Sequence, residues 1–264
     1  MPDRILQVLE RIKAALEEAA RAVSPFVPGA VKAEQKSHGR GPVTEADHAS
    51  NRALREALVR DGEGWLSEES VDSPDRLGRE RVWIVDPLDG TLEFVSGIPE
   101  WCISVACIEN GQAVAGGILN PATGEVFLGA KEKGLTYNGQ PAGPKSRGDL
   151  HGAVVLASRS EIKRGEWEPF TNGLFTVEPM GSVAYKLARV AAGLADATWT
   201  LTPKHEWDVA AGIALVEAAG GFVVGLDREP VRLNNQSALL KGLIAAGAGL
   251  KQPILSLLEP HLHG

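Results

Sequence analysis

The stretch of sequence that decides the fold is Val82-Trp83-Ile84-Val85-Asp86-Pro87-Leu88-Asp89-Gly90-Thr91. Its leading apolar residues predict a buried strand that ends at Asp86, because Pro87 has no N–H to give to a sheet. Asp89 follows inside the turn that the proline forces. Two carboxylates so close together repel each other unless a proton or a cation lies between them. The segment therefore predicts either a cation-binding turn or an Asx-type turn whose acids are solvated.

The two residues that end this stretch add a second expectation. Gly90 lets the backbone come close to a ligand, and Thr91 opens a helical turn whose free N–H groups favour an anion. The oxygen donors just before them suit Mg²⁺ rather than a soft metal. An anion and a divalent cation are thus expected side by side at the end of this strand.

Three further segments bring acids, each with two interpretations. Glu68 follows a predicted strand over residues 65–67, where it is either a candidate ligand or part of a solvated loop. Asp208 precedes an Ala-rich helix and is either a candidate ligand or the N-cap of that helix. Asp47 completes a capping box that begins at Thr44, and this structural role is compatible with a second, chemical one.

The hydrophobic pattern divides the chain near residue 150. Helices are expected over residues 3–24, 44–60, 182–192, 208–219 and 250–258. Strands are expected over residues 65–67, 82–85, 103–108, 113–119, 125–130, 154–157, 197–200, 222–225 and 243–246, with a loop over 25–43. Strands form a run before residue 150 and alternate with helices after it. We therefore expect an N-terminal α+β sub-domain over 1–150, with most of the candidate ligands, and a C-terminal α/β sub-domain over 151–264, with Asp208.

Composition excludes several classes of protein. The net charge of −7 argues against a nucleic-acid polymer as partner, because such binding needs an excess of Lys and Arg. Cys102 and Cys107 lie five residues apart in a predicted strand, so they point to opposite faces and cannot form a disulfide. No secretory leader is recognised, which makes the cytoplasm the expected location. The apolar stretch 209–226 is split by two glycines and predicts a helix and a strand, not a membrane span.

Four segments together resemble the inositol monophosphatase superfamily, in the order and at the spacing of that family. They are Thr44-Glu45-Ala46-Asp47, Ser67-Glu68-Glu69-Ser70, Asp86-Pro87-Leu88-Asp89-Gly90-Thr91, and Trp207-Asp208-Val209-Ala210-Ala211-Gly212 with Glu217-Ala218-Ala219-Gly220-Gly221 after it. The resemblance covers about residues 30–247. It implies an α/β fold (α+β layered), an αβαβα sandwich in which helices alternate with mixed sheets. It also implies a lithium-sensitive, Mg²⁺-dependent phosphate monoester hydrolase that forms a homodimer.

The resemblance further implies a site in which metal-activated water attacks a phosphate ester. Two or three Mg²⁺ ions, with Mn²⁺ as a substitute, would neutralise the phosphate and generate the nucleophile near neutral pH. Their ligands would be Glu68, Asp86, Asp89, Asp208 and the carbonyl of Leu88. The amides of Gly90 and Thr91 would bind the phosphate. The catalytic residues would be Asp47, Thr91 and Glu68, with Thr91 oriented by Asp47 to help deprotonate the water.

Several segments resemble bacterial 3′(2′),5′-bisphosphate nucleotidases more than other members. They are Leu66-Ser67-Glu68-Glu69, Glu93-Phe94 and Ala157-Ser158-Arg159-Ser160. Arg159 is a candidate to hold a second phosphate bidentately, or is an ordinary surface arginine. Gly181 and Ser182 resemble a substrate-contacting turn, and Ser182 alternatively caps a helix. Leu201 and its neighbour Thr200 stand where inositol phosphatases usually place an acid, while Leu92, His205 and Glu206 depart from the nucleotidase pattern.

Adenosine 3′,5′-bisphosphate is therefore the favoured substrate, with inositol 1-phosphate and fructose 1,6-bisphosphate as the alternatives. Either way the expected partner is a small phosphorylated metabolite, with no nucleic acid polymer and no membrane. Two hypotheses of other classes stay open. One is a non-catalytic, metal-dependent binding protein, and the other is a sugar-handling α/β protein whose acids are only structural.

Overall fold

The computed structural model describes residues 3–35, 41–170 and 173–262. Its larger sheet has the strand order β3-β4-β5-β6-β7-β8-β9, in which β3 and β4 are parallel and every other pair is antiparallel. These strands are β3 (Gly64–Ser67), β4 (Arg81–Asp89), β5 (Cys102–Glu109), β6 (Gln112–Asn120), β7 (Glu125–Ala130), β8 (Gly134–Tyr137) and β9 (Gln140–Ala142).

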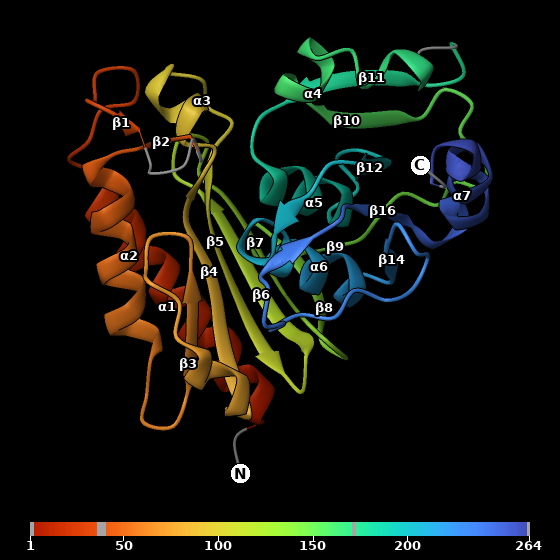
Figure 1. Ribbon diagram of the computed structural model, residues 1–264. Helices are drawn as coiled ribbons and strands as arrows, with labels where there is room; N and C mark the ends of the chain where they lie inside the picture. The colour runs from red at the N-terminus through yellow and green to blue at the C-terminus, as the bar shows by residue number, and fades with distance from the viewer. Residues whose placement is uncertain (1–2, 36–40, 171–172, 263–264) are drawn as a thin grey trace.

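The smaller sheet has five strands in the order β11-β10-β12-β16-β14 (Figure 1). Strand β10 is parallel to β11 and β12, whereas β16 is antiparallel to both of its neighbours. These strands are β10 (Val154–Ser158), β11 (Thr176–Met180), β12 (Ala197–Thr200), β14 (Gly221–Gly225) and β16 (Leu243–Gly247).

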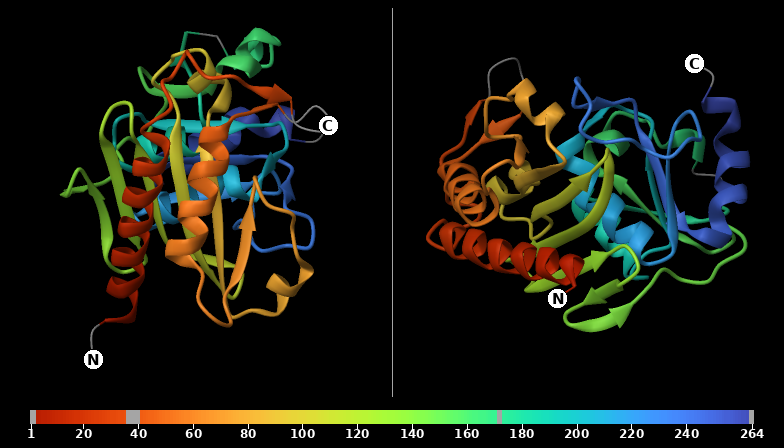
Figure 2. Two further views of the ribbon diagram at one scale, coloured as in Figure 1. Left: turned by 90° about the vertical axis from the view of Figure 1, so that its left-hand side faces the viewer. Right: turned by 90° about the horizontal axis from the view of Figure 1, so that it is seen from below.

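Helices fill the spaces on both sides of the sheets. Helices α1 (Arg4–Val23) and α2 (Glu45–Leu58) lie side by side on one face of the larger sheet (Figure 2). Helices α5 (Val183–Ala191) and α6 (Glu206–Ala218) lie between the two sheets, and α7 (Lys251–Leu258) packs on the outer side of the smaller sheet. The predicted sandwich of alternating helix and sheet layers is therefore confirmed.

Strand β5 shows how the sequence produces these layers. Cys102 and Ala106 pack toward the central helices, whereas Ile103, Val105 and Cys107 pack toward α1 and α2. Alternate side chains of a strand point to opposite faces, so a strand buried on both faces is apolar throughout. Both cysteines are free and buried, as the spacing predicted.

Helix α6 approaches the larger sheet closely because β6 carries a glycine where the helix crosses it. A Cβ atom on Gly116 would lie 2.8 Å from the carbonyl oxygen of Ala211 and 2.8 Å from the Cβ of Ala214. Both contacts belong to α6, so neither can move without displacing the helix.

We expect Gly116→Ala to lower the free energy of unfolding by about 1–3 kcal/mol, the usual range for overpacking a tight core. Gly148→Ala is the matched control, because a Cβ at that position meets nothing within 4 Å. Urea unfolding of both variants measures the difference. Equal midpoints would show that α6 does not depend on this glycine.

Strand β4 corrects the expectation that the strand stops at Asp86. The strand continues to Asp89, with a shift of register against β5 between Asp86, opposite Ser104, and Asp89, opposite Cys102. Pro87 lies within this irregularity, where the strand does not need a backbone N–H to hydrogen-bond with β5. The bulge is the reason that both aspartates reach the end of the sheet.

Short elements account for the other differences from the expectations. The strands β8, β9 and β11 and the helix α4 (Arg159–Lys163) were not expected, whereas α3 (Thr91–Val95) extends the helical turn expected at Thr91. The pairs β13 (Lys204–His205) with β15 (Leu239–Leu240) and β1 (Glu34–Gln35) with β2 (Pro42–Val43) were also missed, the latter inside the predicted loop 25–43. Residues 36–40 of that loop lie outside the described residues. The division into sub-domains 1–150 and 151–264 stays a prediction, although the larger sheet ends at Ala142 and the smaller begins at Val154.

The apolar stretch after residue 208 forms α6 and β14, as expected. In the described part of the chain, no helix combines the length and apolar character needed to cross a membrane.

Candidate active site

A cavity of about 710 Å³ opens where β3 and β4 end and where α3, α5 and α6 begin. The chain brings five carboxylates to it from three separate stretches, Glu93 being the one that was not a candidate ligand, together with most of the other candidate residues. The predicted residues that line it are Glu68, Asp86, Leu88, Asp89, Gly90, Thr91, Arg159, Gly181, Ser182 and Asp208. The remaining candidate, Asp47, is buried behind Thr91.

The bulge of β4 is held from two sides. The amide of Leu88 donates to Oδ1 of Asp86 at 3.0 Å, and the hydroxyl of Ser50 in α2 donates to the carbonyl of Pro87 at 2.6 Å. Asp86 is 1 % exposed. The bond from Leu88 orients the buried Asp86 carboxylate and partly replaces the solvation that it has lost, while the bond from Ser50 holds the backbone of the bulge.

Asp47 performs two roles at once. Its Oδ2 accepts hydrogen bonds from the amide of Thr44 at 2.8 Å and from the hydroxyl of Thr44 at 2.6 Å, which completes the predicted capping box of α2. Its Oδ1 accepts from the hydroxyl of Thr91 at 2.9 Å. Thr91 Oγ1 also lies 3.1 Å from the carbonyl oxygen of Leu88. When the Thr91 hydroxyl donates its hydrogen bond to Asp47, its oxygen lone pairs can accept a hydrogen bond from a donor in the cavity.

Asp89 is bound to the start of α5. Its Oδ2 accepts from the hydroxyl of Ser182 and from the amide of Ala184, both at 2.6 Å. Ser182 is the N-cap of α5 and has a φ of 54°, a strained value for a serine that these bonds help to maintain. Burial raises the pKa of the Asp89 carboxyl above its usual range, and the two hydrogen bonds oppose that rise. Both alternatives for Ser182, cap and site residue, thus have a structural basis.

Asp208 lies inside the first turn of α6 and not at its N-cap, which corrects the alternative interpretation. The N-cap is His205, whose amide donates to Oδ2 of Asp208 at 2.8 Å. Burial and the negative charges of Asp89 and Glu68 raise the pKa of the Asp208 carboxyl well above its ordinary value. This mutual repulsion is a property of the site, and a bound cation would remove it.

Gly90 begins the short helix α3 in the left-handed conformation, with φ of 97°. A Cβ at this position would lie 2.8 Å from the carbonyl oxygen of Glu100 and 3.1 Å from Cα of Trp101. A glycine is therefore required both by the backbone conformation and by the space.

The donor set fits a hard divalent cation. The carboxylates of Glu68, Asp86, Asp89 and Asp208 and the carbonyl of Leu88 supply oxygen ligands only. Within the described ranges, no three or more Asp, Glu, His or Cys side chains already lie close enough together to hold a metal ion by themselves. Mg²⁺ commonly binds through one or two carboxylates and completes its shell with water and substrate phosphate, so an open donor set suits it.

The arginine predicted for a second phosphate is already engaged. Arg159 forms two hydrogen bonds with the carboxylate of Glu100, at 2.9 and 2.5 Å. The same carboxylate accepts from the amide of Gly181 at 2.7 Å, so Glu100 ties the loop before β5 to the turn before α5. The sequence pattern missed Glu100, because nothing local connects residue 100 with residues 159 and 181.

Three lysines line the cavity and none of them was predicted: the exposed Lys163, and Lys186 and Lys204. Lys186 is 4 % exposed, and Lys204 forms an ion pair with the buried carboxylate of Glu161 at 2.9 Å. One sequence signal was present: Lys186 is charged on the face of α5 that carries Ala184, Leu187 and other buried residues.

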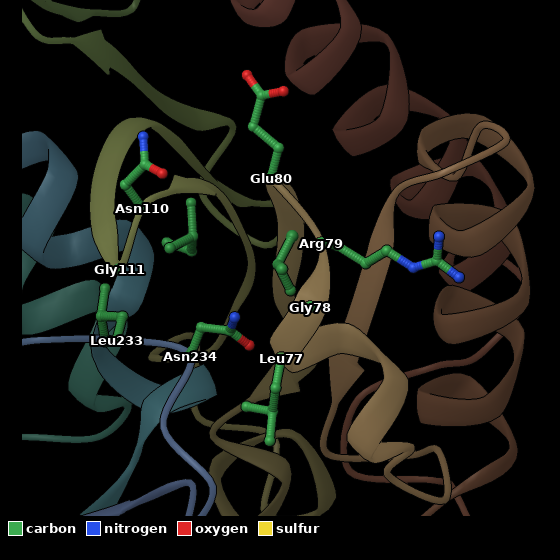
Figure 3. A pocket seen from close by; sticks show the side chains of 10 residues that line it. Leu77, Gly78, Arg79, Glu80, Asn110, Gly111, Leu233 and Asn234 are labelled. Atoms are coloured by element: carbon green, nitrogen blue, oxygen red, sulfur yellow. The ribbon is translucent and has the colours of Figure 1, made fainter.

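A second cavity, of about 460 Å³, lies at the opposite end of β4 (Figure 3). Arg79 extends to the side away from Asn110 and Gly111, which border the other side. Among its described lining residues, Glu80 supplies the single acid, so this cavity does not offer a group of carboxylates that could share a cation.

Comparisons of this chain with a family model, with characterised relatives and with solved structures agree with this geometry. The model of the "Inositol monophosphatase family" matches residues 2–262. An inositol-1-monophosphatase of Mesorhizobium japonicum is 35% identical over 226 residues, which cover 80% of this chain and 84% of that protein. Two solved structures, each 26% identical, are similar in fold. An inositol monophosphatase from Anabaena has a TM-score of 0.83 and coverage of 98% and 97% of the two chains.

The second is CysQ from Bacteroides thetaiotaomicron, a bacterial member of the same family, with a TM-score of 0.76 and coverage of 92% of this chain and 97% of that one. Sequence, fold and the oxygen-rich cavity lead to one assignment. This chain belongs to the inositol monophosphatase family of metal-dependent phosphatases.

Proposed function

We propose that this protein is a Mg²⁺-dependent phosphate monoester hydrolase whose favoured substrate is adenosine 3′,5′-bisphosphate, that is, a 3′(2′),5′-bisphosphate nucleotidase. One observation carries the chemistry: the carboxylates of Glu68, Asp86, Asp89 and Asp208 share a single cavity with the Thr91–Asp47 pair. The choice of ester is supported by the cationic side chains that line the same cavity, among them Arg159, Lys186 and Lys204.

The metal ligands in this proposal are Glu68, Asp86, Asp89, Asp208 and the Leu88 carbonyl. When bound there, divalent cations neutralise the phosphate charge, lower the pKa of a water molecule and stabilise the leaving oxygen. Asp86 and Asp89 reach these positions through the β4 bulge, and Asp208 through the start of α6.

Thr91 and Asp47 together accept the proton that the attacking water loses. Thr91 Oγ1 gives its own proton to Asp47 Oδ1 and accepts one from the attacking water, with Glu68 helping to orient that water. The amides of Gly90 and Thr91 bind the phosphate oxygens from the left-handed turn. The water oxygen bonds to phosphorus, the ester bond to the substrate oxygen breaks, and that oxygen leaves with a proton. The products are an alcohol and inorganic phosphate.

The remainder of the substrate is proposed to contact Gly181, Ser182 and Arg159. Thr200 and Leu201 stand where the inositol phosphatase pattern has an acid, and neither side chain carries a carboxylate that could bind the hydroxyls of an inositol ring. The hydroxyl of Thr200 instead donates to Glu161 at 2.6 Å. Inositol 1-phosphate stays the main alternative, because the Mesorhizobium japonicum relative is named for that activity. Fructose 1,6-bisphosphate is the other alternative, and homodimer formation stays a prediction.

We expect phosphate release to require a divalent cation and to stop when EDTA is added. Mg²⁺ is also expected to raise the melting temperature, because an ion that binds only the folded state stabilises it by about 2.7 kcal/mol at a hundred times its Kd. Phosphate assays and thermal melting with Mg²⁺, Mn²⁺ and EDTA measure both effects. Equal rates with and without EDTA would contradict the proposed chemistry. Stabilisation by the metal without turnover would instead support the non-catalytic binding protein.

The substrate assignment is tested by a panel of adenosine 3′,5′-bisphosphate, inositol 1-phosphate and fructose 1,6-bisphosphate at saturating Mg²⁺. We expect the highest kcat/KM for adenosine 3′,5′-bisphosphate. A higher value for inositol 1-phosphate would replace the nucleotidase assignment and leave the phosphatase chemistry unchanged.

A further inference from the structure

One arginine outside the carboxylate cavity connects two of the segments that carry proposed metal ligands. Arg76 lies in the short 3₁₀ helix η2 (Pro74–Gly78), and its side chain is 1 % exposed. Its guanidinium donates to residue 72 on one side and to residues 234 and 235 on the other. A charged side chain is rarely buried so completely unless its donors find partners, so these contacts define what Arg76 does in the fold.

On one side Arg76 holds the loop that carries Glu68. Its Nε donates to Oδ1 of Asp72 at 2.7 Å and its Nη2 to Oδ2 of Asp72 at 2.9 Å, which is a bidentate pair. Asp72 follows the turn that contains Glu68 after the end of β3. The same turn is fixed to α2, because the side-chain amide of Asn51 donates to the carbonyl of Glu69 at 3.3 Å. The loop is therefore held from both sides.

On the other side Arg76 holds the segment that binds the start of α6. Its Nη1 donates to Oδ1 of Asn234 at 2.6 Å and its Nη2 to the carbonyl of Asn235 at 2.9 Å. The backbone amides of these two asparagines donate to the carboxylate of Glu206 at 2.7 and 2.9 Å, and the side-chain amide of Asn235 adds a third bond at 2.7 Å. Glu206 is fully buried and is the first residue of α6, two residues before Asp208.

Main-chain bonds join the same two segments. The amide of Glu206 donates to the carbonyl of Ala238 at 2.8 Å, and β13 pairs with β15 so that His205 lies opposite Leu239. His205 is also the residue whose amide donates to Asp208. Because residues 204–206 are bound through main chain and side chain to residues 234–240, a displacement of one segment moves the other.

A continuous series of contacts therefore runs from the Glu68 loop through Arg76 to the first turn of α6. The negative charge of Glu68 contributes to the raised pKa of the Asp208 carboxyl, so the two carboxylates repel each other. This repulsion favours separation of the two segments, and the contacts of Arg76 oppose it. An arginine suits this position because its planar group binds partners on two sides in fixed directions, which the single ammonium of a lysine cannot do.

The separation of the ligands matters more for Mg²⁺ than for a larger cation. Mg²⁺ needs a nearly regular octahedron with oxygens at about 2.0–2.1 Å, whereas Ca²⁺ accepts more variable shells at about 2.3–2.6 Å. A donor set held at one spacing can therefore discriminate between the two ions. A loosened set loses more affinity for Mg²⁺ than for Ca²⁺.

We propose that Arg76 is a positioning residue that holds the Glu68 loop and the Asp208 turn at one separation, and so gives the site a preference for Mg²⁺ over Ca²⁺. This rests on the proposed function, since it concerns ligands of the same cavity. Arg76 is not among the described residues that line the cavity, so a substitution there removes no proposed ligand and no proposed substrate contact.

Calorimetry of Mg²⁺ and Ca²⁺ binding to the full chain tests this role without turnover. In Arg76→Met the Kd for Mg²⁺ should rise by about 10- to 100-fold, the range for losing an outer group that orients metal ligands. The Kd for Ca²⁺ should rise less, so the preference for Mg²⁺ should fall. Phosphate release should show the same change as a higher Mg²⁺ requirement, with a smaller loss of kcat at saturating Mg²⁺.

Arg81→Met is the matched control. Arg81 is also largely buried and pairs with Glu63 and Glu109, but it lies at the opposite end of β4 from Asp89. Both variants should lower the melting temperature in EDTA, because both remove buried ion pairs. Only Arg76→Met should change the ratio of the two Kd values, which a merely structural role would not do.

A milder variant keeps the test decisive if Arg76→Met does not fold. Asn234 has a φ of 62°, which glycine adopts readily, so Asn234→Gly removes one partner of Arg76 without straining the backbone. The Kd for Mg²⁺ should rise by about two- to tenfold, the range of one hydrogen bond. Asn138→Gly is its control and should leave the Kd unchanged, because Asn138 has a φ of 49° and its side chain accepts from the amide of Val126.

The contrary outcomes separate the inference from the proposed function. A folded Arg76→Met or Asn234→Gly protein with wild-type Kd values would overturn the role of Arg76, and so would an equal change in the control variants. Equal weakening of Mg²⁺ and Ca²⁺ binding would overturn the discrimination between the ions. A wild type that binds neither ion would overturn the proposed function and the inference with it. Binding of Mg²⁺ without hydrolysis of any ester of the panel would overturn the proposed function alone.

Discussion

Replacing Asp89 by asparagine is expected to lower kcat by roughly a hundredfold or more, the usual loss when one transition-state charge stabiliser is removed. The proposed role of Asp89 is to supply one negative charge to a divalent cation. Asparagine has the same shape, so its amide oxygen can still accept from Ser182 and Ala184. Its amide nitrogen then faces the cavity, where a cation would repel it. Phosphate release at saturating Mg²⁺ measures the loss.

The control for this variant is its stability without metal. Because the hydrogen bonds to α5 are kept and a repelling charge is removed, the melting temperature of Asp89→Asn in EDTA should equal or exceed that of the wild type. In Mg²⁺ the variant should gain less stability than the wild type. A normally folded Asp89→Asn protein with wild-type kcat would contradict the assignment of Asp89 as a ligand.

Asp47→Asn should lower kcat by about 10²–10⁴-fold, the range for loss of a positioned general base. Asparagine can still accept from the amide of Thr44, but the proton of Thr91 then has no carboxylate to receive it. The carboxylate of Asp47 lies behind Thr91 and does not line the cavity, so the Mg²⁺ concentration for half-maximal stabilisation should change little. Rate measurements with a Mg²⁺ titration separate the two effects.

Thr91→Val provides a matched test of the same pair. If Thr91 and Asp47 act as one unit, the double variant should be little slower than the slower single variant, because effects within a unit are not additive. Rate losses that multiply would show two independent roles. A strong rise in the Mg²⁺ requirement of Asp47→Asn would show that Asp47 acts on the metal ligands rather than on a proton.

The individual elements followed from local patterns, whereas the layer order and the grouping of the acids at one site followed from the resemblance to the family. The capping box at Thr44 and Asp47, the apolar run 82–85 and the Ala-rich segment after Asp208 each have a signal within a few residues. The ends of these elements were harder to predict. Pro87 suggested a strand end, but the larger sheet accommodates it in a bulge, so tertiary pairing with β5 overrode the local rule.

The contacts that hold the cavity wall in place could not be predicted from local patterns. Glu100 contacts residues 159 and 181, and Lys186 contacts Ser158, so both depend on chain segments that are distant in sequence. The strands β8, β9 and β11 are short and only partly buried, which weakens the hydrophobic period that identifies a strand. Stability of such elements comes from their neighbours rather than from their own residues.

The bonds from Ser182 and Ala184 to one oxygen of Asp89 join the end of the larger sheet to a helix that lies almost a hundred residues later. The end of β4 and the turn before α5 therefore cannot shift independently of each other. Across homologous proteins, the turn before α5 should therefore be restricted in conformation as strongly as position 89 itself.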